Sequence, residues 1–266
     1  MSERVFALIA GSGFENGWLP GMSEAALPRE MPFGAPASPV LEGRIGDHRV
    51  LFLQRHGENH RYPPHAIPYA ANLWALREAG ATDVFAVGTV GAVSEALPPG
   101  AICIPDDLVD RTWGRQSTFY TGPETGVQHV DFTHPFSEGL RQELIKAALA
   151  AEVPVMDGGV YWCTQGPRLE TAAEVRVVSQ LGGAMIGMTA CPEAAVAREA
   201  GLRYALLGLS VNWAAGISDS KESIDFESIK ESMERMTAGV REIIRTAVLS
   251  VKVIPQGKGR FSADFP

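Results

Sequence analysis

The chain has 266 residues, of which 45% are hydrophobic and 20% are charged, with 23 Lys and Arg against 31 Asp and Glu. The normal apolar fraction and the small net charge of −8 exclude disorder as the main state, and the length is sufficient to bury a large core. The acidic balance argues against a nucleic-acid-binding surface, because phosphate backbones are bound by clustered cations.

Short apolar segments alternate with helical patterns along the chain. The predicted strands lie at residues 5–10, 50–53, 84–87, 101–104, 160–164, 184–187 and 204–211. The predicted helices lie at residues 69–79, 137–152, 170–181, 193–200 and 226–251, with Ser137 as an N-cap. This alternation predicts the α/β class, with a mainly parallel or mixed sheet that helices cover on both faces. We expect one domain over residues 1–252 and a peripheral or mobile tail over residues 253–266.

The cysteines and the apolar runs bear on the cellular compartment. Cys103, Cys163 and Cys191 are far apart and form no CxxC pair, so we interpret them as reduced, buried thiols. The apolar run at residues 5–10 is too short for a signal peptide, and no window reaches 18 uninterrupted apolar residues. We therefore expect a cytoplasmic protein without membrane contact.

Small or donor-rich residues follow several of the predicted strands. They are Ser12 between two glycines, Arg55 and His56, Thr89, and Thr189. Ligands of open α/β sheets bind at the carboxyl ends of strands. These residues together indicate a site for inorganic phosphate or a similar oxyanion, with a cation and an imidazole donor as an anion clamp.

Other interpretations of the same loops fit less well. The glycine after Gly13 that a dinucleotide fingerprint requires is one position late, at Gly17, and no GK[ST] phosphate loop is present. His56, His60 and His65 invite a metal interpretation, but glycine and prolines between them prevent a shared helix face. We expect no metal, and a solvated loop remains the alternative.

Two polar residues after later strands have both structural and functional interpretations. Glu170 lies where a helix is predicted to begin, so it can be a first-turn acid that faces the helix dipole. Asn212 can be a turn residue or an amide that is presented to a ligand. Met188 and Trp213 are packing residues by default.

Longer motifs resemble a known family, that of the trimeric purine nucleoside and methylthioadenosine phosphorylases. Its phosphate-binding half is similar to RHGENHRYPPHAIPYAANLWALREAGATDVFAVGTVGAV, and its nucleoside-binding half to QGPRLETAAE, MIGMTACPEAAVAREAGL and LSVNWAAG. The resemblance extends in collinear order over about residues 4–250. It implies one α/β domain around a twisted mixed β-sheet, in a homo-oligomer that is usually a trimer.

The family's reaction is phosphorolysis, in which a nucleoside and phosphate give a free base and a ribose 1-phosphate without a cofactor or metal. By resemblance, the phosphate would be held by Ser12, Arg55, His56, Thr89 and Thr189. Ser12 stands where many members have Thr, and Thr89 stands where relatives often have Ala. The nucleoside would be contacted by Met188, Glu170, Thr171, Asn212, Trp213 and Ala214.

The resemblance also bears on the base, for which Glu170 and Asn212 are the implied catalytic residues. Relatives specific for adenine nucleosides have a D-x-D pair where this chain has Asn212-Trp213-Ala214. Glu170 can accept the N1–H of a 6-oxopurine, and the Asn212 amide can donate to O6 or N7. A site that hydrogen-bonds a polar substrate group rejects the analogue that lacks it, so we expect 6-oxopurines rather than adenine.

The 5′ substituent depends on the segment that leads into the last helix. This segment contains no His for a 5′-hydroxyl but has Phe226 and Ile229, which either form an apolar pocket or pack in the core. By resemblance, His129 of a neighbouring subunit would cap that pocket. The motifs are similar to those of S-methyl-5′-thioinosine phosphorylases.

We therefore expect cleavage of S-methyl-5′-thioinosine to hypoxanthine and 5-methylthioribose 1-phosphate. The alternatives are a general inosine and guanosine phosphorylase and, less favoured, a methylthioadenosine phosphorylase. Two other classes fit less well: a dinucleotide oxidoreductase lacks its third glycine, and a non-catalytic purine-binding protein does not need the full set of phosphate and base groups.

Overall fold

The structure, a computed structural model, describes residues 3–14, 17–220 and 226–251, with side chains from residue 233 onward in the last range. Its strands are β1 Phe6–Ala10, β2 Ser23–Glu24, β3 Leu41–Ile45, β4 His48–Gln54, β5 Asp83–Ala92, β6 Ile102–Ile104, β7 Asp107–Asp110, β8 Val155–Asp157, β9 Val160–Cys163, β10 Gly183–Gly187 and β11 Arg203–Trp213. Its helices are α1 Tyr69–Glu78, α2 Glu138–Ala150, α3 Ala172–Gln180, α4 Ala190–Glu199 and α5 Phe226–Ser250, with short 3₁₀ turns at Glu58–His60, Pro64–Ala66 and Ser218–Ser220.

The described strands form one mixed sheet centred on β5. Strands β1 and β11 flank β5 in parallel, β4 continues the parallel side beyond β1, and β10 pairs with the end of β5 in the antiparallel sense. The main path runs β2-β3-β4-β1-β5-β10-β9-β7, and β11 connects β5 to β6 and β8. The expected α/β class with a mixed sheet is confirmed.

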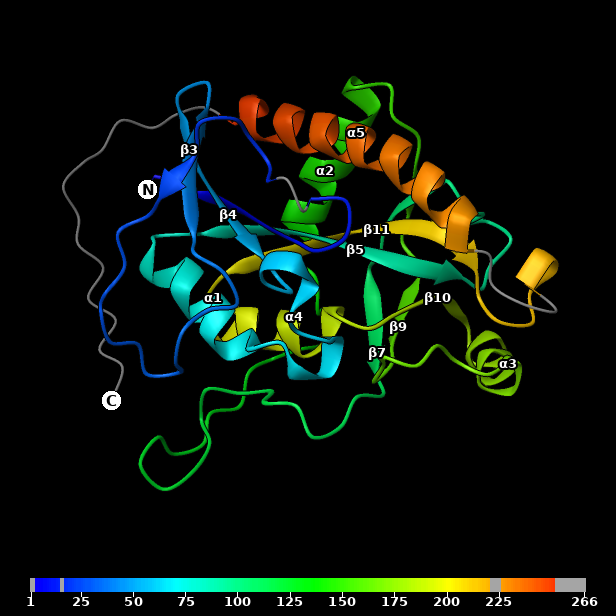
Figure 1. The fold of residues 1–266 in the computed structure, drawn as a ribbon, viewed down its shortest axis with the longest axis horizontal. Helices are drawn as coiled ribbons and strands as arrows, with labels where there is room; N and C mark the ends of the chain where they lie inside the picture. Colours follow the sequence, from blue (N-terminus) through cyan, green and yellow to red (C-terminus); the bar gives the residue numbers. More distant parts are fainter. Residues whose placement is uncertain (1–2, 15–16, 221–225, 252–266) are drawn as a thin grey trace.

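Helices cover both faces of this sheet, as Figure 1 shows, with α2 and α5 on one side and α1 and α4 on the other. The alternation of side chains along β1 explains the arrangement. Phe6 and Leu8 pack in the core under α2 and α5, whereas Ala7 and Ile9 pack in the core under α1 and α4. A strand buried on both faces reads as a continuous apolar run, which is why the sequence pattern identified it.

The strand boundaries differ from the prediction where glycines interrupt the apolar runs. β5 continues through Gly88 and Gly91 to Ala92, because β11 pairs with it along this length. Thr89 and Asn212 therefore lie within strands rather than in the loops after them. The strands β2, β3, β7 and β8 were not predicted, because they are short or partly exposed and carry no apolar run.

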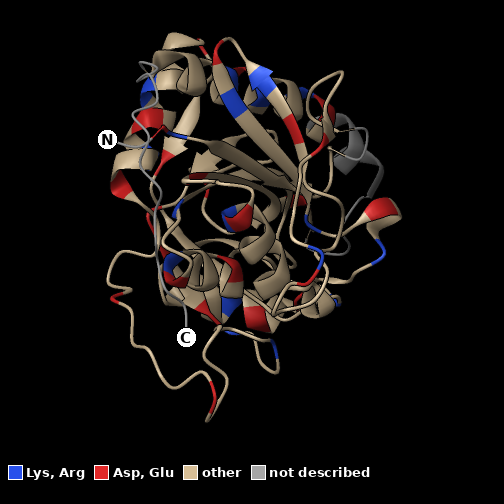
Figure 2. Cartoon of the chain, turned by 90° about the vertical axis from the view of Figure 1, so that its left-hand side faces the viewer, with Lys and Arg blue, Asp and Glu red and all other residues tan. Residues whose placement is uncertain are grey.

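Charged residues of both signs are interspersed over the elements on view in Figure 2. In the part of the chain that the structure describes, no helix is long and apolar enough to cross a membrane. The three cysteines are buried and free, as expected. Ser137 is the N-cap residue of α2, but its side chain makes no capping hydrogen bond.

Candidate active site

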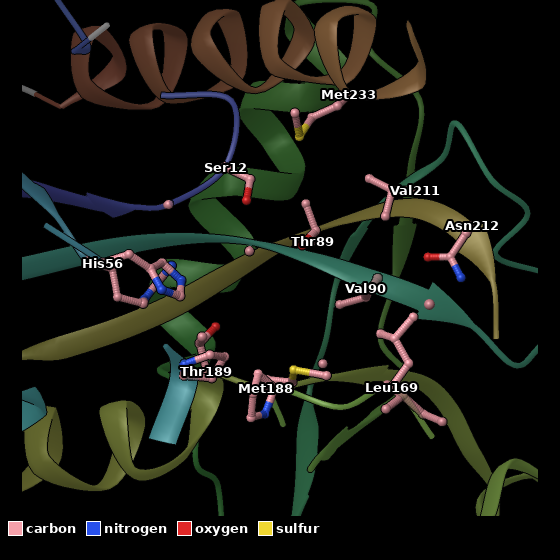
Figure 3. A pocket seen from close by; sticks show the side chains of 18 of the residues that line it. Ser12, His56, Thr89, Val90, Leu169, Met188, Thr189, Val211, Asn212 and Met233 are labelled. Atoms are coloured by element: carbon pink, nitrogen blue, oxygen red, sulfur yellow. The ribbon is translucent and has the colours of Figure 1, made fainter. Parts of the chain in front are cut away.

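A cavity of about 530 Å³ lies where β1, β4 and β10 end, beside the second half of β5 and the end of β11. Many residues predicted for the site line it, although they are distant in the sequence. These residues are Ser12, Arg55, His56, Thr89, Glu170, Met188, Thr189, Asn212 and Ala214. Figure 3 shows Ser12, His56 and Thr189 toward one end of the cavity, and Asn212 toward the other.

Arg55 is buried and paired with a carboxylate. Its Nε lies 2.6 Å from Oε2 of Glu193 and its Nη2 lies 2.8 Å from Oε1, while Tyr204 Oη also donates to Oε1. Nη1 and Nη2 additionally donate to the carbonyls of Val87 and Ile9. Burial opposes the charge of Arg55, but the attraction of Glu193 outweighs it and raises the pKa of Arg55. The sequence predicted an anion clamp of a cation and an imidazole donor. In the structure the cation is paired with Glu193, and four of the five N–H groups of Arg55 donate to acceptors.

His56 lies beside Arg55 and is mostly buried. Burial lowers its pKa to about 4, so the imidazole is neutral at physiological pH. Nδ1 donates to the carbonyl of Tyr62 at 2.8 Å, which leaves Nε2 as an acceptor. A Cβ at Gly11 would come within 2.8 Å of the His56 ring, so the tight turn after β1 requires glycine here. The predicted imidazole donor is therefore an acceptor toward the cavity.

Hydroxyl groups complete this end of the cavity. Ser12, Thr89 and Thr189 line it, and Thr189 is the N-cap residue of α4. The Thr189 side chain makes no capping hydrogen bond, so its hydroxyl is not committed to the helix. His60, whose ring stacks on His56 at 4.2 Å between centroids, also lines the cavity. From the sequence, His60 had been interpreted only as a candidate metal ligand.

Glu170 provides the carboxylate at the other end. Oγ1 of Thr164, just after β9, donates to Oε1 of Glu170 at 2.5 Å. Glu170 precedes α3 by two residues, so the first-turn interpretation is wrong; Glu174 takes that position and forms a capping box with Thr171. Thr164 was missed because the predicted strand 160–164 includes it, whereas β9 ends at Cys163 and leaves Thr164 in the following loop.

Asn212 lies near the end of β11, where the pairing with β5 shifts register. This irregularity brings two consecutive residues, Val211 and Asn212, to the cavity wall. Nδ2 of Asn212 donates to the carbonyl of Trp213 at 2.6 Å. Leu169 lies on the same side of Figure 3 as Asn212.

Two methionines contribute sulfur to the cavity wall. Met188 follows β10, and a Cβ at Gly166 would come within 2.4 Å of its Sδ, so the loop before Glu170 packs closely on it. Met233 reaches the cavity from α5, above Ser12 in Figure 3. Met233 was missed, although it continues the spacing of Phe226 and Ile229 along the helix.

Several predicted site residues are not brought to this cavity. The Thr171 hydroxyl caps α3 by accepting from Glu174 N, and Trp213, the last residue of β11, does not line the cavity. His129 is exposed in the segment between β7 and α2, which extends away from the sheet in Figure 1. The side chains of Phe226 and Ile229 lie outside the described residues. The described part of the chain holds no cluster of three or more His, Cys, Asp or Glu side chains suited to a metal ion.

Comparisons with known proteins agree with this geometry. A chain named probable S-methyl-5'-thioinosine phosphorylase from Xanthomonas campestris is 46% identical over 215 residues, covering 81% of this chain and 86% of the relative. The 6-oxopurine nucleoside phosphorylase of Pyrococcus furiosus is 38% identical over 255 residues, covering 94% and 93%.

A solved structure is also similar. The methylthioadenosine phosphorylase of Schistosoma mansoni in complex with adenine matches with a TM-score of 0.84 at 30% identity, over 92% of this chain and 91% of that one. The family profile described as Phosphorylase superfamily matches residues 5–249. The fold, the cavity and these matches agree, and the chain belongs to the phosphorylase superfamily.

Proposed function

We propose that this protein cleaves 6-oxopurine nucleosides with inorganic phosphate, and that S-methyl-5′-thioinosine is its preferred substrate. The products would be hypoxanthine and 5-methylthioribose 1-phosphate. The observation that carries the proposal is one cavity with hydroxyl donors and His56 at one end and Asn212 at the other, where Leu169, the neighbour of the lining residue Glu170, also lies. The names of the relatives from Xanthomonas and Pyrococcus support the same reaction.

The phosphate would occupy the end formed by Ser12, Arg55, His56, Thr89 and Thr189. Because Glu193 already balances the charge of Arg55, phosphate would be held mainly by hydroxyl donors and by the remaining N–H of Arg55. Hydrogen phosphate carries one P–OH group, which can donate to Nε2 of neutral His56. The site would thus take the dianion in a defined orientation beneath the sugar carbon.

The purine would occupy the other end of the cavity. Phosphorolysis proceeds through an oxocarbenium-like sugar while negative charge develops on the leaving base, so donors and acceptors must be placed before the reaction begins. The Thr164 hydroxyl keeps Glu170 oriented, and its carboxylate would accept N1–H of hypoxanthine. The amide of Asn212 would donate to O6 or N7, with Ala214 beside it and Met188 under the ribose.

The 5′ substituent would lie against Met233 and Val211. Both are apolar, and the thioether of Met233 is a soft, polarizable surface for a methylthio group. We propose that the active form is a homo-oligomer, a trimer by family resemblance, in which His129 of a neighbouring subunit closes this end.

The deciding experiment compares phosphate-dependent base release from S-methyl-5′-thioinosine, inosine, guanosine and methylthioadenosine by kcat/KM. We expect S-methyl-5′-thioinosine to have the highest value. A preference for methylthioadenosine would contradict the roles of Glu170 and Asn212, and equal cleavage of inosine would contradict the apolar 5′ end.

The substitution N212D tests the base assignment separately. An aspartate removes the amide donor, so we expect the ratio of kcat/KM for 6-oxopurine over 6-aminopurine nucleosides to fall by at least about tenfold. An unchanged ratio would mean that the base is selected elsewhere.

A further inference from the structure

Arg115 does not line the cavity, but its guanidinium donates hydrogen bonds to groups in two segments that do. It lies in the segment between β7 and α2, and its side chain is partly buried. We propose that Arg115 is a positioning residue that holds the base end and the phosphate end of the cavity in a fixed relation. The catalytic consequence rests on the proposed function, whereas the structural consequence does not.

On one side, Arg115 binds the segment that follows β9. Nη2 donates to the carbonyl of Thr164 at 3.1 Å and to that of Gln165 at 2.7 Å. Nε donates to Oε1 of Gln165 at 3.3 Å. Thr164 in turn donates its hydroxyl to Glu170, so Arg115 holds the backbone from which the base-binding carboxylate is oriented.

On the other side, Arg115 binds the segment between β10 and α4. Nη1 lies 2.8 Å from the carbonyl oxygen of Met188 and 2.8 Å from that of Cys191. These two carbonyls bracket Thr189, whose hydroxyl belongs to the phosphate end. Tyr69 Oη, at 3.2 Å from Nη1, completes the surroundings of the guanidinium.

A guanidinium is suited to this task because its N–H groups lie in one rigid plane. Four of its acceptors here are backbone carbonyls, from two segments that carry opposite ends of the cavity. A lysine ammonium offers three donors from a single point, so it can bind one segment but not fix both. Because small errors of placement in a reacting pair cost about 10²-fold in rate, this fixed relation matters for catalysis.

The test uses R115K in the full chain, with R115A as a second variant. We expect R115K to remain folded by circular dichroism, with kcat/KM for S-methyl-5′-thioinosine lowered about 10²-fold and weaker binding of both hypoxanthine and phosphate. Guanidinium ion added to R115A should restore part of the activity, whereas urea should not. Hydrogen exchange without ligand should accelerate in residues 164–170 and 187–191 together.

Arg198 provides the matched control, because its guanidinium also donates to two loop carbonyls, those of Asp131 and His134, away from the cavity. We expect R198A to leave kcat/KM and the exchange of both segments unchanged. Exchange in R115K that accelerates in one segment alone, or in neither, would overturn the inference. Failure of the wild-type protein to cleave any 6-oxopurine nucleoside would instead overturn the proposed function, and the exchange experiment would still decide the role of Arg115.

Discussion

The two ends of the cavity are built in different ways. At the phosphate end, Arg55 is 1% exposed and His56 and Thr189 are each 8% exposed, and the first two are held by hydrogen bonds that leave few donors uncommitted. At the base end, Glu170 and Asn212 are partly exposed, and among the described residues each is held by one side-chain hydrogen bond. The neighbouring Leu169 is 40% exposed.

This difference matches what each end would recognise under the proposed function. Phosphate would be the same co-substrate for every nucleoside, so a rigid, buried and preorganised site for it would cost no selectivity. The base and the 5′ substituent distinguish one nucleoside from another. Contacts from a few side chains, near the end of β11, before α3 and on α5, would allow single residues to set that selectivity.

The largest effect should come from breaking the buried pair at the phosphate end. R55M leaves the Glu193 carboxylate buried without a cation, so we expect the free energy of unfolding to fall by about 3–5 kcal/mol in urea titrations. In the double variant R55M/E193L most of this stability should return, while the KM for phosphate stays high. Recovery of phosphate affinity along with stability would show that Arg55 serves the fold alone.

His56, at the phosphate end, should make the free energy of unfolding of the protein depend on pH. Its pKa is about 4 in the folded state and 6.5 in the unfolded state, so the unfolded chain binds the proton first as the pH falls. From about pH 7 to about pH 5, His56 should therefore lower the free energy of unfolding by about 2 kcal/mol. H56N, which keeps a donor for Tyr62 O but does not titrate, should lose less stability over this range; an identical loss would contradict the neutral, buried imidazole.

A substitution at Met233, against which the 5′ substituent would lie, should change substrate selectivity rather than the free energy of unfolding. M233Q places an amide where the thioether lies, so the ratio of kcat/KM for S-methyl-5′-thioinosine over inosine should fall about tenfold. The KM for phosphate should stay close to the wild-type value, because the Met233 thioether has no N–H or O–H group to donate to phosphate. If M233Q instead weakened phosphate binding and left the ratio of kcat/KM for S-methyl-5′-thioinosine over inosine unchanged, Met233 would act on phosphate binding rather than on selectivity.

The smallest effect concerns Thr171, which was predicted to contact substrate and instead caps α3. T171A should lower the free energy of unfolding by about 1 kcal/mol through loss of the cap. The selectivity for base and 5′ substituent should stay as in the wild-type protein. A change in base selectivity would indicate that Thr171 contacts the substrate, as the sequence predicted.

The sequence alone determined the class of the fold and most of the elements. Buried strands such as β1 are continuous apolar runs, and α5 follows a 3.6-residue spacing, so local composition suffices to identify them. Residues that follow strands, such as Ser12 and Arg55, were also identified, because chain connectivity places strand ends at one edge of a sheet.

The tertiary structure decided the chemical state of those residues. Arg55 is neutralised by Glu193, which lies 138 positions away, and Arg115 reaches carbonyls 49 to 76 positions away. The local sequence pattern does not identify such distant partners. Backbone carbonyls cannot be recognised as specific acceptors from the sequence either, because every residue has one. The sequence therefore identified most of the residues that line the cavity, whereas long-range packing decided that Thr171 and Trp213 lie outside it and Met233 within it. Long-range packing also decided the charge and the hydrogen-bonding roles of the lining residues.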